Sequence, residues 1–465
     1  MLIQNLHREI IFLICESICP HCQKLHKDWP DAGSTGEIPP PPPAKERRQA
    51  IFNLSLVCKR WGYIAQKVLH HHFGYFETRP KAEFLFCRTL SENPELGKHV
   101  KEARIRHLSV CDWSLDEEWL AKALIKFSGV LDFPETSTVP DTSKWGDFIA
   151  PLILLQVPTL DQLSVQNGHL NEIMRKFRVL FVGKQYVLPQ CIKSLLVTSS
   201  PIVNGTSTGV FLDLSDSAMG GLLSANRSIQ ALKLCNPSPQ SIPDRLDLLC
   251  VRELNLSDSA FSRRELQLLI SATGPLEQFE YYGLYRSELN GVTLQDICEL
   301  LASKKRSLVS LQLETPCKAQ HFTSAKRLIN VSCMGFLVDG FWSPTDSDPV
   351  LEEHALLHMF PPNLTELWLD IPETTILGIL DALVNYIIST CRDKKEDQAL
   401  GHVVIRVLTS IHRESSEFPM AVNRSAWEEI KKRCQTFLKH GRLSMLLTCW
   451  KTGRGRLVSH EFDYH

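Results

Sequence analysis

The chain has 465 residues, of which 43% are hydrophobic and 22% are charged, and this composition is typical of a globular protein with a large buried core. Its formal net charge is -1 at pH 7, from 51 basic and 52 acidic residues. A chain so close to neutrality has no long-range field to attract nucleic acid or an anionic membrane, so we expect neither as a partner.

Two apolar segments, 6–14 and 54–65, stand near the N-terminus. In each, apolar residues recur at three- and four-residue steps, which indicates a short amphipathic helix. The insert 20–48 between them contains five consecutive prolines, so we expect it to be disordered and not helical. Glu9 and Glu16 bracket the apolar run of the first segment and leave it too short for a signal sequence or a membrane span.

The fifteen cysteines have no spacing that suggests a disulfide framework. Reduced thiols are typical of reducing compartments, so we expect a cytoplasmic or nuclear protein.

The two N-terminal segments resemble an F-box, the helical module that joins a protein to the Skp-family linker of a cullin-RING ubiquitin ligase. The first segment is similar to the opening motif L-P-x-E-I-x-x-x-I, although His7 stands where the family usually has proline, and the second is similar to L-S-x-V-C-K-R-W. The resemblance implies nine linker-binding residues, namely Leu6, Glu9, Ile10, Ile14, Leu54, Val57, Cys58, Arg60 and Trp61. We expect about half of them to pack inside the module itself.

The middle of the chain predicts helices at 81–90, 115–127 and 144–156 and a strand within 100–110. Pro151 is expected to kink or split the last helix. The stretch 88–100 resembles the one that leads into a repeat domain in fungal F-box proteins. The three histidines His70–His72 are expected at a partly exposed helix end, where they point in different directions and cannot share one metal ion.

A shared apolar spacing, L-x-x-L-x-L or a close variant, recurs in the rest of the chain. The seven segments begin at Leu160, Ile192, Ile229, Val251, Leu276, Leu308 and Leu364, and the widest gap leaves room for another unit near 329–338. Amphipathic helices are expected between some of them, at 263–270 and 294–303, as crossovers between parallel strands. Serial segments of this kind indicate leucine-rich repeats, and a generic α/β domain is the alternative.

After the seventh segment we expect a helix at 374–391, a strand at 403–408, a capped helix at 425–440 and a last unit at 443–450. The predicted fold class is therefore α/β, α+β at the N-terminus: a short helical module followed by an irregular leucine-rich-repeat-like solenoid. The expected domains are 1–73 for the module, 74–157 for linking helices and a first strand, and 158–465 for the repeats with a C-terminal cap.

Strand positions that alternate with the inward leucines are expected to face outward. Several of them are acidic or aromatic, and we select as candidate target-binding residues Glu253, Glu280, Tyr282, Glu314, Glu366, Trp368 and Asp370. One interpretation is that exposed strand positions are polar in any sheet. The other is that this face binds a basic segment of a target protein.

Cysteines are concentrated at the start of the insert. A zinc site built from Cys15, Cys19, Cys22 and His26 has suitable ligands, and unliganded thiols in a loop are the alternative. Cys19-Pro-His-Cys22 also has the spacing of a redox dithiol but lacks the strand-then-helix context of those enzymes. We therefore expect no resident cofactor, with zinc kept as an alternative.

Catalytic motifs are not found: the sequence has no phosphate-binding glycine loop, no G-x-S-x-G and no H-E-x-x-H. The sequence thus predicts a non-enzymatic substrate receptor of an SCF-type ubiquitin ligase, which binds the linker and cullin complex at one end and an unidentified target at the other. The alternatives are an F-box-like repeat scaffold without ubiquitin transfer and a zinc or thiol-redox protein.

Overall fold

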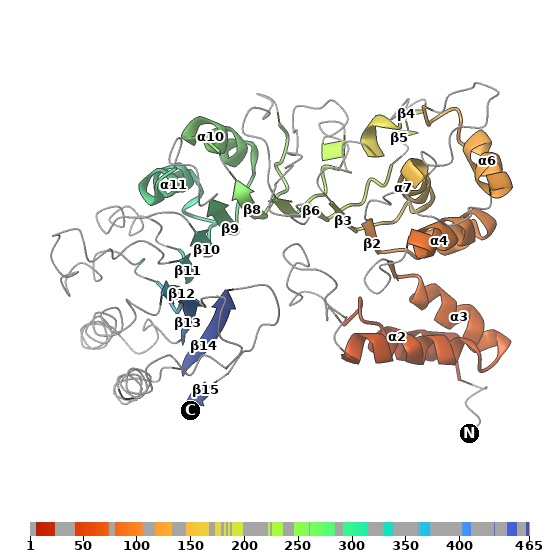
Figure 1. The fold of residues 1–465 in the computed structure, drawn as a ribbon, viewed down its shortest axis with the longest axis horizontal. Helices are drawn as coiled ribbons and strands as arrows, with labels where there is room; N and C mark the ends of the chain where they lie inside the picture. The colour runs from red at the N-terminus through yellow and green to blue at the C-terminus, as the bar shows by residue number, and fades with distance from the viewer. Residues whose placement is uncertain are drawn as a thin grey trace. The chain divides into compact units, whose positions relative to one another are not determined.

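A computed structural model gives the fold of the chain (Figure 1). It describes residues 6–23, 42–73, 80–105, 117–132, 146–166, 173–177, 181–182, 185–186, 188–198, 222–223, 226–235, 246–259, 261–283, 292–314, 328, 330–337, 361, 363–372, 402–410, 432, 444–452 and 462–464. The chain forms two compact units, Met1–Val251 and Arg252–His465. Both contain parallel strands, and helices accompany them, so the protein is a mixed α/β protein, as predicted.

The first unit begins with a module of three helices: α1 Arg8–Ile18, α2 Pro42–Ser55 and α3 Lys59–Leu69. Because α2 starts at Pro42, the prediction of a non-helical insert is wrong for 42–48. Proline is favoured in the first turn of a helix, and the Ala-Lys-Glu-Arg-Arg-Gln run that follows has high helix propensity. Residues 20–23 of the insert form a turn, and residues 24–41 lie outside the described residues.

The second predicted helix, 54–65, is interrupted by a turn. The amides of Leu56 and Val57 donate to carbonyls three residues back, Asn53 at 3.1 Å and Leu54 at 3.2 Å, and close the end of α2. Cys58 is then extended and precedes α3. Two short helices therefore stand where the apolar pattern indicated one, because the pattern keeps its three- and four-residue steps across the turn.

The three helices share one apolar core. Its fully buried residues are Ile11, Cys15, Cys19, Ile51, Trp61, Ile64, Ala65 and Val68. Gly62 allows the close approach of α2 and α3, because a Cβ atom at this position would lie 2.7 Å from the carbonyl oxygen of Ser55. The module is thus packed around its own centre.

Five parallel strands pair in the order β1-β2-β3-β6-β7 within the first unit. Their bounds are His72–Phe73, Glu102–Ile105, Gln162–Gln166, Ser194–Thr198 and Ala231–Cys235. The helices between them are α4 Pro80–Glu92, α5 Pro94–Gly97, α6 Glu117–Lys126 and α7 Gly146–Gln156, and β4 Phe181–Val182 pairs antiparallel with β5 Gln185–Tyr186.

Two expectations in this unit are corrected. His71 and His72 do not sit at an exposed helix end: α3 stops at Leu69, the chain enters β1, and the two rings are 4% and 6% exposed. Pro151 does not split α7, which continues through it from Gly146 to Gln156. Proline removes one backbone hydrogen bond there, and the buried residues on both sides of it keep the helix packed.

Among the described residues, no helix combines the length and apolar character needed to cross a membrane.

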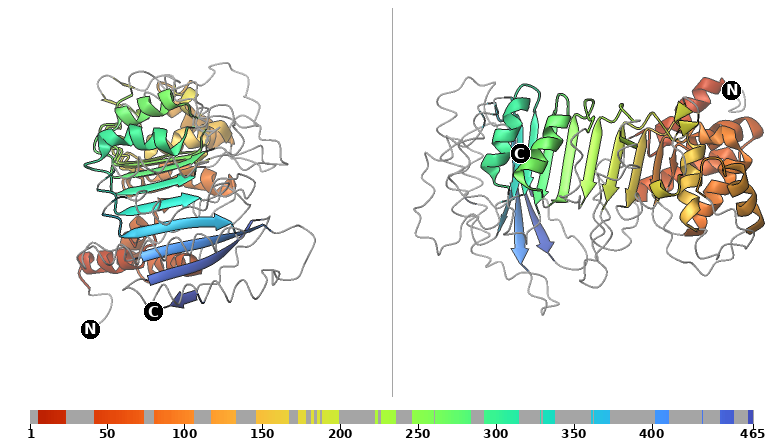
Figure 2. Two further views of the ribbon diagram at one scale, coloured as in Figure 1. Left: turned by 90° about the vertical axis from the view of Figure 1, so that its left-hand side faces the viewer. Right: turned by 90° about the horizontal axis from the view of Figure 1, so that it is seen from above.

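In the second unit, β8 to β14 are parallel, each paired with the next, and β15 runs antiparallel to β14 (Figure 2). Their bounds are Glu253–Ser259, Gln278–Gly283, Ser310–Glu314, Cys333–Leu337, Glu366–Pro372, His402–Ser410, Ser444–Thr452 and Phe462–Tyr464. Every one of the seven recurring apolar segments of the chain contains a parallel strand. The additional unit near 329–338 contains β11, the strand expected at 403–408 is β13, and the last unit expected at 443–450 contains β14.

Helices α10 Arg263–Ala272 and α11 Leu294–Leu301, the latter followed by the short 3-10 helix η4 Ala302–Lys304, lie side by side over one face of these strands (Figure 2). Each begins with a capping box, Ser262 with Glu265 and Thr293 with Asp296. The side chain of each residue of the pair accepts a hydrogen bond from the backbone amide of the other. The helix expected at 374–391 lies outside the described residues, and of the helix at 425–440 only Lys432 is described.

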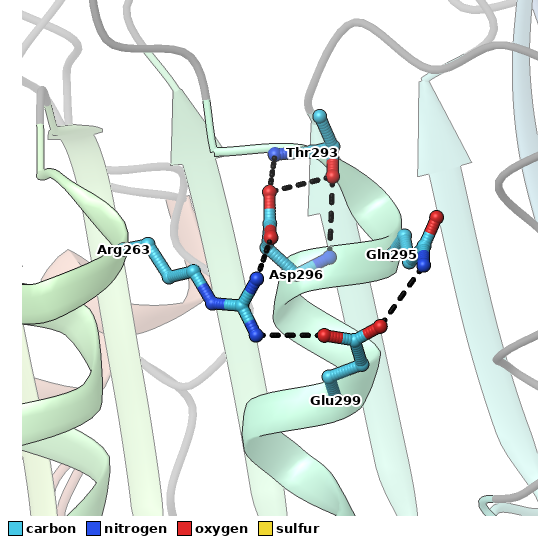
Figure 3. A network of polar contacts seen from close by, with 5 residues as sticks. All are labelled: Arg263, Thr293, Gln295, Asp296 and Glu299. Atoms are coloured by element: carbon cyan, nitrogen blue, oxygen red, sulfur yellow. Dashed lines mark hydrogen bonds and ion pairs between the residues drawn. The ribbon is translucent and has the colours of Figure 1, made fainter.

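Arg263 connects the two helices (Figure 3). Its guanidinium donates to Asp296 Oδ1 at 2.8 Å and to Glu299 Oε2 at 2.7 Å, and Gln295 donates to the other oxygen of Glu299 at 2.9 Å. The contact fixes the spacing of neighbouring crossover helices on their solvent side.

Candidate functional site

The three-helix module exposes an unusual number of apolar side chains. Of the ten large hydrophobic side chains that are exposed among the described residues, six belong to it. We call these six the apolar surface residues: Ile10, Leu13, Phe52, Leu56, Val57 and Tyr63, with exposed fractions of 45%, 59%, 44%, 70%, 52% and 60%. A contiguous patch of exposed apolar groups is typical of a protein-binding surface, so the concentration of six on one small module makes it a candidate.

The local structure explains why these side chains face outward. Ile10 and Leu13 are three residues apart on α1 and lie on one face of that helix. Leu56 and Val57 occupy the turn between α2 and α3, where the backbone leaves the core. Tyr63 is on α3, and the Nζ atom of Lys67 lies 4.1 Å from the centre of its ring.

The nine predicted linker-binding residues divide into three groups. Glu9, Ile10 and Val57 are exposed. Leu6, Ile14, Leu54, Cys58 and Arg60 are half-buried. Trp61 is only 3% exposed and belongs to the core.

Four of the apolar surface residues, Leu13, Phe52, Leu56 and Tyr63, were not among the predicted nine. Two of them had a signal in the sequence: Leu56 lies in the segment that resembles the closing F-box motif, and Leu13 has an i, i+3 relation to Ile10.

The strand register of the second unit aligns the candidate target-binding residues in rows. One row contains Glu253, Gln278, Ser310, Cys333 and Glu366, and the next contains Asn255, Glu280, Gln312, Gly335 and Trp368. Tyr282 stands opposite Glu314, and Asp370 stands opposite Leu337. Because side chains alternate along a strand, these positions share the face opposite to the buried leucines. Neither row includes a lysine or an arginine.

Hydrogen bonds connect neighbouring strands along these rows. Asn255 Nδ2 donates to Glu280 Oε2, and the Tyr282 hydroxyl donates to Gln312 Oε1 at 3.0 Å. Glu253 is exposed, and Glu280, Tyr282 and Glu366 are half-buried. For Glu314, Trp368 and Asp370 the structure describes the backbone and not the side chain.

A cluster of thiols and imidazoles lies where α1 ends. The ligand atoms of Cys19, His21, Cys22 and His71 all lie within 4.8 Å of one another. Cys22 Sγ is 3.4 Å from His71 Nδ1 and 3.8 Å from His21 Nδ1. These four residues could hold a metal ion.

This cluster differs from the set expected from sequence. Cys19 and Cys22 are part of it, but Cys15 is not: its side chain is fully buried in the module core, and burial raises the pKa of its thiol to about 11. His26 lies outside the described residues. His21 and His71 were missed, and His71 is 49 residues from Cys22, so no local spacing could have indicated it.

No model of a known protein family matches this chain, and no curated protein is similar to it. The fold and sites define a mixed α/β protein in which a three-helix module with exposed apolar side chains precedes a long series of parallel strands.

Proposed function

We propose that this protein is the substrate-receptor subunit of an SCF-type ubiquitin ligase. Its F-box-like module, α1 to α3, binds the Skp-family linker, and its leucine-rich-repeat-like strands bind a target protein. The protein catalyses no reaction itself. It holds the target near the charged ubiquitin-conjugating enzyme of the cullin complex and so raises the local concentration of the target.

The exposure of Leu56 and Val57 carries this proposal. Both belong to the segment that resembles the closing F-box motif, and both project from the α2–α3 turn with 70% and 52% exposure. Two adjacent apolar side chains gain free energy when a partner covers them, about 1.5–3 kcal/mol for each one fully buried. Ile10 and Leu13 on α1 add apolar area of the same kind.

The target-binding half of the proposal is supported by the aligned rows on the second unit. The two rows contain Glu253, Glu280 and Glu366 without a lysine or an arginine, and Tyr282 lies beside them, although Asp370 stands opposite Arg406. Carboxylates attract a basic segment and aromatic side chains anchor it, so the target is expected to present a basic or mixed basic and apolar segment.

Co-purification of the full-length protein with a Skp-family linker tests the first half. Val57→Asp with Leu56→Asp places two charges in the expected interface, and we expect at least a tenfold loss of linker binding, as for a central interface residue that contributes about 2 kcal/mol. Leu85→Asp is the matched control, because Leu85 is 47% exposed but lies on α4 outside the module.

The control variant should bind the linker like the wild type. If the wild-type protein does not bind the linker, the ligase proposal fails, and a repeat scaffold without ubiquitin transfer becomes the better interpretation. Equal binding by the double variant and the wild type would show that the α2–α3 turn is not the contact.

A further inference from the structure

The Cys19, His21, Cys22 and His71 cluster joins two parts of the chain that are far apart in sequence. Cys19 is the C-cap of α1, and its amide donates to the carbonyls of Cys15 and Glu16. The amide of Gln23 donates to the Cys19 carbonyl at 3.1 Å and closes a turn that places Cys22 beside Cys19. His71 comes from the connection between α3 and β1.

Two sulfur–nitrogen distances within the cluster are close to those of a tetrahedral zinc site. Zinc–sulfur and zinc–nitrogen bonds of about 2.3 and 2.0 Å put sulfur and nitrogen ligands about 3.6 Å apart. The two measured sulfur–nitrogen distances, 3.4 and 3.8 Å, lie on either side of this value. The largest separation within the set is 4.8 Å, so small side-chain adjustments complete the tetrahedron.

We infer that Cys19, His21, Cys22 and His71 form a structural zinc site. Two thiolates and two imidazoles are a donor set that zinc prefers, and the two thiolate charges neutralise the ion. Four protein ligands leave no open position for water or substrate, so the site stabilises the fold and does not catalyse a reaction.

Burial favours a metal site over a redox dithiol at the same cysteines. Cys19 is 2% exposed, and it lies at the C-terminal end of α1, where the helix dipole disfavours a thiolate nucleophile. A thiolate buried there is stabilised when a cation binds it, and a zinc ion supplies that charge.

The site would connect α1 to the end of α3. A metal clip between Cys22 and His71 closes a segment of 49 residues that includes the insert, and such a clip removes chain entropy from the unfolded state. It would also hold the helix that carries Ile10 and Leu13. The inference does not rest on the proposed function, because zinc content is measured without any partner.

The test measures zinc in the full-length protein after purification under reducing conditions and dialysis against metal-free buffer. We expect about one zinc ion per chain, with two sulfur and two nitrogen ligands in the X-ray absorption spectrum. Cys22→Ser and His71→Gln should lower the zinc content to less than half. His70→Gln and Cys191→Ser are matched controls outside the cluster and should keep it.

Wild-type protein without bound zinc, even after titration with zinc chloride, would overturn the inference. A ligand shell without two sulfurs, or a Cys19–Cys22 disulfide in the reduced preparation, would also overturn it. If the variants do not fold, cobalt(II) added to the zinc-depleted wild type decides the matter: the spectrum of a tetrahedral thiolate site supports the inference, and an octahedral spectrum contradicts it.

Discussion

The three-helix module and the strands of the second unit use apolar residues in opposite ways. In β8, β9 and β10 the patterned residues are fully internal: Leu254, Phe279 and Leu311 are at most 1% exposed. In the module, the apolar pattern leaves Val57 52% exposed. The strands therefore bury their patterned apolar residues, whereas the module leaves part of its apolar pattern exposed.

This difference matters because apolar periodicity predicts a helix in one region and a strand in the other, but in neither does it show what covers each apolar residue. Burial of apolar area contributes about 25 cal/mol per Å², whether the cover is another part of the chain or another protein. Substitutions in the two regions should accordingly affect different measurements: unfolding in the strands, and association on the surface of the module.

The largest effect is expected in the strands. Phe279→Ala removes a fully buried ring from β9, and such a truncation costs about 3–5 kcal/mol of stability. Hydrogen exchange measured by mass spectrometry should show faster exchange in β8, β9 and β10, and linker binding by the module should stay unchanged. If Phe279→Ala reduced linker binding as much as it reduced the protection of β8, β9 and β10, the two regions would not have separate roles in stability and binding.

Two aromatic residues on α3 allow buried and exposed apolar side chains to be compared within the module. Trp61 is 3% exposed and Tyr63 is 60% exposed. Trp61→Ala should destabilise the module by about 3–5 kcal/mol. Tyr63→Ala should change its stability by less than about 0.5 kcal/mol and weaken linker binding about tenfold. Hydrogen exchange of α1 to α3, followed by a linker-binding titration, separates the two effects.

Charge reversal at two candidate target-binding residues tests whether this face of the second unit binds a target. Glu280→Lys with Asp370→Lys should abolish capture of the target, since both changes repel a basic segment. Glu95→Lys with Glu118→Lys changes the net charge equally at exposed positions on α5 and α6 and should leave capture intact. Capture is measured by quantitative mass spectrometry of proteins retained by each full-length variant, and undiminished capture by the first variant would refute the prediction.

The sequence predicted the strands well because each one depends on local alternation. Leu254, Phe279 and Leu311 lie in recurring segments that predicted strands, and the structure places a strand at each. The unit at β11 was also predicted, although only from the width of the gap. The capping box at Ser262 was missed, although Ser-Arg-Arg-Glu265 has its spacing.

The candidate sites were harder to predict because they depend on exposure and on distant contacts. The helical periodicity of α3 places Trp61 on its buried face and leaves Tyr63 outside it. It does not show how much of Tyr63 stays exposed, because that depends on how α1 and α2 cover the helix. His71 joins Cys22 only after α3 has packed against α1 and brought the start of β1 beside the turn at Cys22. The place of His71 in the cluster was therefore beyond any local pattern, whereas His21 stands between Cys19 and Cys22 in the sequence.

The smallest effect is expected on the solvent side of the crossover helices, where Arg263 bridges α10 and α11 (Figure 3). Arg263→Ala removes two ion pairs, but the arginine side chain is 55% exposed, so water and salt screen them. The expected loss of stability is about 0.5–1 kcal/mol, smaller at high salt, seen as faster hydrogen exchange at the start of α11. Arg264→Ala is the matched control on the next residue of α10 and should show no such change.

Acid should have a related effect on the same helix start. Although burial opposes it, the hydrogen bonds from Thr293 and the charge of Arg263 lower the pKa of Asp296 in the folded protein. A lowered carboxyl pKa stabilises the fold above the ordinary value of about 4, and this contribution is lost as the pH falls through the folded value. Arg263→Ala should therefore reduce the difference in α11 protection between pH 6 and pH 3. An unchanged difference would show that Thr293 alone sets the pKa of Asp296, and that the bridge between the helices contributes nothing to it.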